Sequence, residues 1–156
     1  LIWIRAAGRE RFEYHGDAAK TSATYRGDHF TLGDVGHLDP EGYLYLTDRR
    51  ANVVISGGVN IYPAEIDAVL LSHPAVVDAA TIGVPDPEWG ERVLALVQAR
   101  PGADTRSLPA ELLALCRARL AGYKCPRSVE LVETLPRDDN GKAYKRRLRD
   151  AYGAGA

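Results

Sequence analysis

Three short segments carry residue types that could bind a ligand or take part in a reaction. Asp34 lies between Gly33 and Gly36, where a ligand can approach closely and a carboxylate can accept two hydrogen bonds from a vicinal diol such as ribose. A plain turn aspartate is the structural alternative. Gly57-Gly58 permits either close contact with another molecule or chain segment, or a tight strand reversal. Lys142 follows a pair typical of a type I′ turn, Asn140-Gly141, so its ammonium either reaches a phosphate or is solvated.

The elements that would position these residues indicate an α+β fold from about residue 53 onward. A helix is predicted to begin at Pro63, whose missing N–H is harmless at the first helical position, and Pro74 ends it. Apolar spacing predicts further elements, which are strands at 53–56, 76–84, 92–98 and 128–132, an amphipathic helix at 107–121 and a basic helix at about 144–152. We expect a small domain with a short hairpin and a roughly three-stranded sheet packed by helices.

The N-terminal part of the chain has weaker patterns. Residues 1–5 are rich in β-forming types, whereas residues 6–31 are mostly small, polar or charged and show no periodicity. Turn residues then flank short strands, and residues 43–47 are predicted to form one strand of a hairpin. We expect residues 1–30 to be disordered or to pair with another molecule, for example in a homodimer through exposed N-terminal strands.

Composition argues against several classes of function. With 156 residues and a net charge of −1, the chain can bury one core but has no overall field to attract nucleic acid or an anionic membrane. No apolar run approaches the roughly 20 residues that cross a bilayer. The two cysteines are too few for a disulfide framework, have no metal-ligand spacing, and fit a reducing, cytoplasmic compartment. Basic residues cluster at 142–149, where nucleic-acid binding competes with a solvated helix face, and the balanced net charge favours the solvated face.

Longer motifs stand at intervals along the chain. They are Phe30-Thr-Leu-Gly-Asp-Val-Gly36, Asp39-Pro-Glu-Gly-Tyr43, Asp48-Arg49, Ser56-Gly-Gly-Val-Asn-Ile-Tyr-Pro-Ala-Glu-Ile66 and Leu135-Pro-Arg-Asp-Asp-Asn-Gly-Lys142. In this order and spacing they resemble the AMP-forming acyl-CoA synthetases. These enzymes belong to the adenylate-forming superfamily, together with luciferase and the adenylation domains of peptide synthetases. The resemblance covers nearly the whole chain, from about Ile2 to Leu148.

The resemblance implies roles for individual residues. Asp34 would bind the ribose hydroxyls of ATP and of the acyl-adenylate, and Arg49 would lie near the same ribose and phosphate. Lys142 would be the mobile cation of the first half-reaction, in which a carboxylate attacks the α-phosphorus of ATP. The C-terminal domain would then rotate, withdraw the lysine and present Gly57-Gly58 to the pantetheine of CoA. The resemblance implies ATP or AMP, CoA and Mg²⁺ as cofactors, and no metal ligand within this sequence.

The resemblance also implies domain boundaries. Residues 1–47 would be the end of a large AMP-binding domain, 48–52 a hinge, 53–152 the C-terminal lid domain and 153–156 a disordered tail. The hinge residue of the family is usually Asp or Lys, whereas Ala51 stands there in this sequence. The triphosphate loop, the acyl pocket and the Mg²⁺-binding glutamate would belong to the large N-terminal domain, which would be the main partner of this segment.

The expected function is that of a C-terminal part of a fatty or aryl acid–CoA ligase, in fatty acid metabolism or a related use of carboxylic acids. The segment alone would be inactive, because most of the active site lies elsewhere. The alternative is a non-catalytic orphan lid that acts as an interaction module. The identity of the acid is not encoded in these residues.

Overall fold

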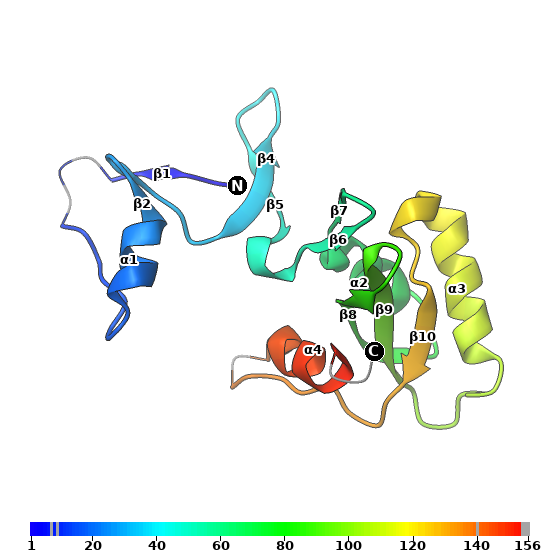
Figure 1. Ribbon diagram of the computed structural model, residues 1–156. Helices are drawn as coiled ribbons and strands as arrows, with labels where there is room; N and C mark the ends of the chain where they lie inside the picture. The colour runs from blue at the N-terminus through cyan, green and yellow to red at the C-terminus, as the bar shows by residue number, and fades with distance from the viewer. Residues whose placement is uncertain (7, 9, 140, 154–156) are drawn as a thin grey trace. The chain divides into compact units, whose positions relative to one another are not determined.

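In the computed structural model, which describes residues 1–6, 8, 10–139 and 141–153, the chain divides into two units (Figure 1). The N-terminal unit is Leu1–Ala51 and the C-terminal unit is Asn52–Ala156. The division falls within a short 3₁₀ helix, η1 (Arg50–Asn52), that contains the predicted hinge residue Ala51. No helix in the described part of the chain is both long and apolar enough to cross a membrane.

The N-terminal unit contains two small antiparallel sheets and one helix. Its elements are β1 (Ile4–Arg5), α1 (Ala18–Thr24), β2 (Tyr25–Arg26), β3 (His29–Phe30), β4 (Asp34–Leu38) and β5 (Leu44–Arg49). The strand order is β1-β3-β2 in one sheet, and β4 pairs with β5 in the other. Asp17 caps α1 by accepting a hydrogen bond from the backbone N of Lys20 at 2.8 Å.

The expected disorder of residues 1–30 is wrong for the described residues. Phe12 contacts three aromatic rings, with centroids 5.6 Å away at Tyr14, 5.5 Å at Tyr25 and 5.3 Å at Phe30. These rings come from positions with no regular spacing, so periodicity could not reveal their cluster. β1 pairs with β3 inside the chain, and the homodimer through the N-terminal strands stays a prediction.

The C-terminal unit is built on a mixed five-stranded sheet. Its elements are β6 (Val54–Ser56), β7 (Val59–Ile61), α2 (Pro63–Leu71), β8 (Val76–Asp86), β9 (Gly90–Ala99), α3 (Leu108–Arg119), the 3₁₀ helix η2 (Gly122–Lys124), β10 (Ser128–Leu131) and α4 (Lys145–Gly153). The expected hairpin and three-stranded sheet are therefore parts of one sheet, in which β9 pairs with β8, β10 and, at Gly90, with β6. The α+β class is confirmed. Gly153 ends α4, whereas the rest of the predicted tail lies outside the described residues.

The loop predicted between the two long strands is shorter than expected. β8 continues to Asp86 and β9 begins at Gly90. The carboxylate of Asp86 closes the turn, because its Oδ1 accepts hydrogen bonds from the backbone N of Glu88 at 3.0 Å and of Trp89 at 2.9 Å.

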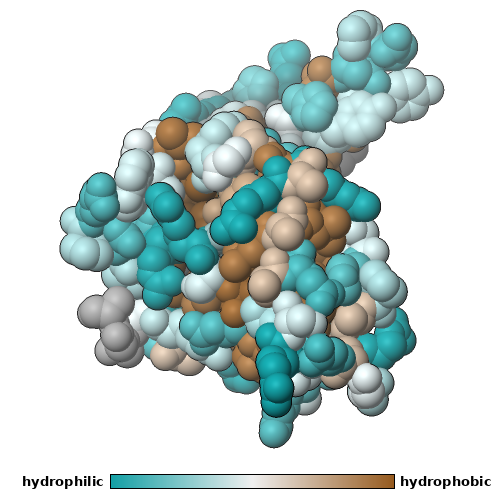
Figure 2. Space-filling view, turned by 90° about the vertical axis from the view of Figure 1, so that its right-hand side faces the viewer, coloured by the Kyte–Doolittle hydropathy of each residue, from teal (hydrophilic) through white to brown (hydrophobic). Residues whose placement is uncertain are grey.

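Two apolar clusters pack against the sheet. Alternate residues of β9 belong to different clusters. In the first cluster, Val93, Ala95 and Val97 pack with residues of α2 and α3. In the second, Leu94 and Leu96 pack with residues of the C-terminal segment 135–148. Because β9 is buried on both sides, its sequence is a continuous apolar run instead of an alternating one. Leu135 and Leu148 belong to the second cluster and fix both ends of the segment that carries Lys142. Elsewhere apolar side chains reach the surface among hydrophilic ones, as Figure 2 shows for one face.

Candidate functional site

Asp34 and Arg49 lie side by side in the N-terminal unit. They are paired residues on the neighbouring strands β4 and β5, and Arg49 Nε lies 3.3 Å from Asp34 Oδ1. The Asp34 side chain is 29% exposed and the Arg49 side chain 60% exposed, so both are accessible to a ligand. The pairing thus brings together two residues that were predicted to bind one nucleotide.

The glycines beside Asp34 have structural reasons of their own. Gly33 has φ +84°, in the left-handed region, and its carbonyl accepts a hydrogen bond from Arg50 N at 2.7 Å. At Gly36 a Cβ atom would lie 2.2 Å from the carbonyl oxygen of Tyr45. The missing side chain therefore permits the close approach of the neighbouring strand at Gly36, whereas Gly33 serves through its positive φ angle.

Gly57 and Gly58 form the two-residue turn of the β6–β7 hairpin. Their φ angles are +57° and +79°, and both positive values are required in a type I′ turn. The turn also contacts the β8–β9 connection, because Gly57 N donates to Trp89 O at 2.9 Å. The ring of Trp89 lies so close that a Cβ on Gly57 would be 2.6 Å from its Cε3 atom. The structure thus shows the tight strand reversal and a close contact with a ring of the same chain, whereas contact of this pair with another molecule stays a prediction.

A cavity of about 600 Å³ borders Gly57 in the C-terminal unit. Its lining includes the aromatic rings of Trp89 and Tyr123 and the guanidinium groups of Arg117 and Arg127. The guanidinium carbon of Arg127 lies 5.6 Å from the centroid of the Trp89 ring. Exposed rings beside cations suit a ligand that has both a flat or apolar part and phosphates. Sequence reasoning did not single out these four residues, although Trp89 and Tyr123 stand in segments rich in turn-forming residues.

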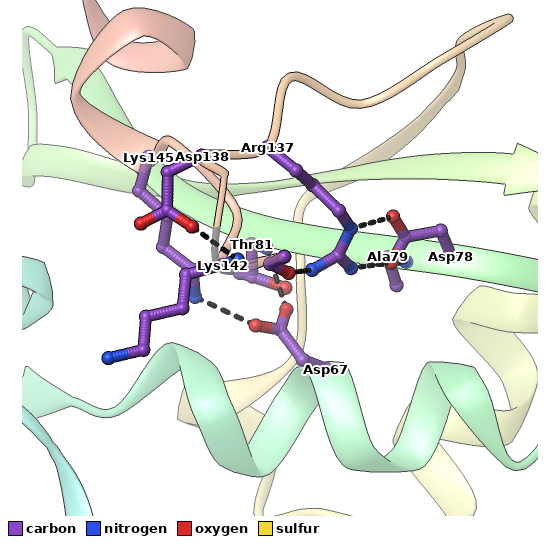
Figure 3. Close-up of polar contacts among 9 residues, drawn as sticks. Asp67, Asp78, Ala79, Thr81, Arg137, Asp138, Lys142 and Lys145 are labelled. Atoms are coloured by element: carbon purple, nitrogen blue, oxygen red, sulfur yellow. Dashed lines mark hydrogen bonds and ion pairs between the residues drawn. The ribbon is translucent and has the colours of Figure 1, made fainter.

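Lys142 lies in a polar turn of the C-terminal unit. Asp138 holds this turn, because its Oδ1 accepts from Lys142 N at 2.8 Å while Asp138 N donates to Lys142 O at 2.9 Å. The Lys142 side chain is exposed, and no described residue accepts a hydrogen bond from its ammonium, which extends away from the surrounding polar groups (Figure 3). Gly141 N donates to Asp138 O at 2.8 Å, so the turn begins at Asp138; the predicted type I′ turn includes Asn140, which lies outside the described residues.

Two ion pairs flank Lys142. Arg137 binds Asp78 of β8, and Lys145 Nζ lies 2.7 Å from Oδ2 of Asp67 on α2 (Figure 3). Burial raises the pKa of the Asp67 carboxyl, and the ammonium of Lys145 opposes that rise. The hydrogen bond to Asp78 raises the pKa of Arg137 above its usual value, so the guanidinium stays charged.

The remaining candidate groups can be placed briefly. Ala51 is exposed in η1, at the division between the units. The described residues contain no cluster of three or more His, Cys, Asp or Glu side chains that could hold a metal ion. Both cysteines are free thiols, and burial raises the pKa of Cys116 to about 11.

Comparison with protein-family models shows which family the chain belongs to. The model of the AMP-binding enzyme C-terminal domain matches residues 65–142, which are half of the chain. The chain belongs to the adenylate-forming superfamily. The predicted resemblance is thereby confirmed, and the matching part is the C-terminal domain of AMP-forming acyl-CoA ligases. The match begins in α2 and ends at Lys142.

Similar proteins place the segment at the end of larger ligases. A 2-succinylbenzoate–CoA ligase of Geobacillus kaustophilus is 46% identical over 83% of this chain and 26% of its own length. A long-chain-fatty-acid–CoA ligase of Mycobacterium tuberculosis is 40% identical over 91% of this chain and 28% of its own length. The crystal structure of ATP-bound MatB from Rhodopseudomonas palustris superimposes with a TM-score of 0.80 and 38% identity, over 86% of this chain and 27% of MatB. The chain thus spans about a quarter of the length of these relatives.

Proposed function

We propose that the chain is the C-terminal part of an ATP-dependent acid–CoA ligase. The complete enzyme converts a fatty or aryl acid, ATP and CoA into acyl-CoA, AMP and pyrophosphate through an acyl-adenylate. The proposal rests mainly on the environment of Lys142. Its ammonium is exposed and has no partner among the described residues, whereas its backbone N is bound by the carboxylate of Asp138. The names of the relatives support the reaction class, whereas their different acids leave the substrate of this protein open.

Lys142 serves the adenylation step in this proposal. An oxygen of the substrate carboxylate attacks the α-phosphorus of ATP, and the bond from that phosphorus to pyrophosphate breaks. Negative charge shifts among the phosphoryl oxygens during the transfer, so a positioned ammonium lowers the barrier. In this proposal Asp34 accepts hydrogen bonds from the ribose hydroxyls, and Arg49, whose Nε lies 3.3 Å from the Asp34 carboxylate, binds near the same ribose and phosphate. Mg²⁺ and the acid are bound by the large N-terminal domain.

The hairpin turn at Gly57-Gly58 serves the thioester-forming step. The thiol of CoA attacks the carbonyl carbon of the acyl-adenylate, and AMP leaves with the bonding electrons. The cavity beside Gly57 offers two aromatic rings, Trp89 and Tyr123, and two guanidinium groups to the pantetheine and phosphates of CoA. A hinge at residues 48–52, which includes Ala51, lets residues 53–152 turn between the two steps.

A fusion protein tests the proposal. In this test ligase, the chain replaces the matching C-terminal quarter of the Geobacillus kaustophilus 2-succinylbenzoate–CoA ligase. ATP–pyrophosphate exchange reports adenylation, and CoA consumption with supplied acyl-adenylate reports thioester formation. Lys142→Ala should lower exchange about 100-fold to 1,000-fold, which is the usual effect of removing one transition-state donor. Thioester formation should keep its rate.

Lys20→Ala is the matched control, because it removes the same charge from helix α1 of the N-terminal unit. Both half-reactions should be unchanged in this variant. Equal losses in both half-reactions of Lys142→Ala would refute the role of Lys142 in adenylation.

The isolated 156-residue chain should catalyse no ATP–pyrophosphate exchange, since the acid pocket and the triphosphate loop are supplied by the large domain. Exchange above the background of a Lys142→Ala chain would contradict this expectation. The orphan interaction module is the second candidate. It would be favoured if the test ligase folds and binds ATP but shows no exchange with Lys142 intact.

A further inference from the structure

The turn that carries Lys142 is tied to two other elements by charged side chains on either side of it. Arg137 precedes Lys142 and reaches β8, whereas Lys145 follows it and reaches α2 (Figure 3). The partners are distant in sequence, 59 residues apart for Arg137 and Asp78 and 78 residues apart for Lys145 and Asp67.

Arg137 links the sheet to the backbone beside Lys142. Its Nε donates to Asp78 Oδ2 at 2.7 Å, and its Nη2 donates to the other carboxylate oxygen, so the pair is bidentate. Its Nη1 donates to the carbonyl of Gly141, the residue before Lys142. Asp78 is itself held, because its side chain is 13% exposed and its Oδ1 accepts from Ala79 N at 2.9 Å. One guanidinium therefore connects a fixed carboxylate with the peptide group that joins Gly141 to Lys142.

Lys145 fixes the other side of the turn. Its ammonium lies 2.7 Å from Asp67 Oδ2, and the second oxygen of Asp67 accepts from Thr81 N at 2.7 Å. Both side chains of this pair are largely buried, at 11% and 16% exposure. Asp67 thus joins α2, β8 and the first residue of α4 at one point.

Placing Lys145 at the start of α4 and burying its ion pair with Asp67 both cost free energy, so a gain in stability does not by itself explain why the pair is there. α4 begins with three basic residues and has no acidic residue in its first turn, which opposes the helix dipole. Burial raises the pKa of Asp67 in spite of its cationic partner. A buried ion pair of this kind commonly adds little net stability, and its best-supported use is to define which groups lie where.

We propose that Arg137 and Lys145 are positioning residues that set the place from which Lys142 reaches the reacting phosphate. This proposal rests on the proposed role of Lys142 in adenylation. The Lys142 side chain has no described partner of its own, so its reach depends on where its backbone is held. Leu135 and Leu148 fix the outer ends of the segment through apolar packing, and the two ion pairs fix the exposed turn between them. A misplacement of about 1 Å at a reacting centre costs on the order of 100-fold in rate.

The proposal predicts a loss in one half-reaction only. Lys142 acts in adenylation, so weakening its supports should lower exchange and leave thioester formation from supplied acyl-adenylate intact. A purely structural role of Arg137 would lower both half-reactions together. The ratio of the two rates therefore separates positioning from folding.

The first test is Arg137→Lys in the test ligase. Lysine keeps the positive charge but cannot bind the carboxylate through two nitrogens and donate to Gly141 O as well. We expect the turnover of exchange to fall about 10-fold to 100-fold, with the KM for ATP nearly unchanged. Arg100→Lys is the matched control, because Arg100 also donates to a backbone carbonyl, that of Pro74 at 2.9 Å, outside the Lys142 segment. It should leave both rates unchanged.

The second test combines Arg137→Lys with Lys142→Ala. Because Arg137 acts through Lys142, exchange by the double variant should fall no further than exchange by Lys142→Ala alone. Additional loss in the double variant, or equal loss of both half-reactions in Arg137→Lys, overturns the positioning role. An unchanged exchange rate in Arg137→Lys overturns it as well.

The outcomes also separate this proposal from the proposed function. If Lys142→Ala lowers exchange selectively and Arg137→Lys does not, the positioning role fails and the role of Lys142 stands. If Lys142→Ala has no selective effect, the proposed function fails first. Lys145→Met would leave the buried Asp67 carboxylate without its cation and is prone to unfold, so the Arg137 variants carry the test.

Discussion

Alanine at Gly57 should destabilise the C-terminal unit more than alanine at Gly58, although the two glycines share one turn. Both have positive φ angles, +57° and +79°, so either substitution places an L-residue in the left-handed region. Only at Gly57 does the added methyl group meet another side chain, since its Cβ would lie 2.6 Å from Cε3 of Trp89. At Gly58 no heavy atom outside its neighbours lies within 4 Å of the added Cβ.

The expected magnitudes follow from these two terms. The left-handed conformation costs an L-residue about 1–2 kcal/mol, which is the whole effect expected for Gly58→Ala. Overpacking adds about 1–3 kcal/mol at Gly57. Trp89 is 42% exposed and can shift its ring, so the added term should lie near the lower end of this range. The free energy of unfolding should therefore fall about 1 kcal/mol further in Gly57→Ala than in Gly58→Ala.

Urea denaturation of the 156-residue chain measures this difference, with an unchanged m-value as the check that both variants unfold in the same way. Trp89→Ala supplies the decisive background. With the ring removed, the two alanine variants should become equally stable, because only the backbone term remains. If Gly57→Ala stays less stable than Gly58→Ala without the ring, the contact with Trp89 does not explain the difference.

Further predictions concern the nucleotide, the buried ion pair and the thiols. Asp34→Ala in the test ligase should raise the KM for ATP in exchange about 10-fold to 150-fold, since a charge-assisted hydrogen bond contributes about 1.5–3 kcal/mol; an unchanged KM would exclude ribose binding by this residue. Lys145→Met should lower the free energy of unfolding by about 3–5 kcal/mol, whereas Lys124→Met, which breaks a more exposed pair, should cost at most about 1 kcal/mol; urea titration showing the reverse order contradicts the burial argument. At pH 8, iodoacetamide should modify Cys125 and spare Cys116, which is buried with its pKa raised to about 11; mass spectrometry showing equal rates would contradict this. Because that pKa is raised above 9.0, the contribution of the protonated Cys116 thiol to stability is present below pH 9 and is lost as the pH rises towards 11.

Local sequence signals predicted much of the C-terminal unit. Pro63 begins α2 as expected, and the helix buries Ile66 and Leu70, which are about one helical turn apart. The hairpin at Gly57-Gly58 follows from the preference of glycine for positive φ angles. These predictions succeed because each depends only on residues that are close together in the sequence. The prediction of disorder at residues 1–30 failed because order there depends on contacts between residues that share no local pattern, as in the aromatic cluster around Phe12.

The sequence by itself determined the family of this protein and the candidate residues Asp34, Arg49 and Lys142, because motif order and spacing survive without coordinates. The tertiary structure decided what surrounds them. It placed Trp89 on Gly57, and it placed Asp78 and Asp67 against the segment of Lys142 from positions 59 and 78 residues away from their partners. Such contacts leave no period or motif in the chain, because they exist only after β8 and α2 have packed against the last segment. The sequence alone shows that residue 142 is a cationic lysine, and only the tertiary contacts of its segment determine where that cation lies.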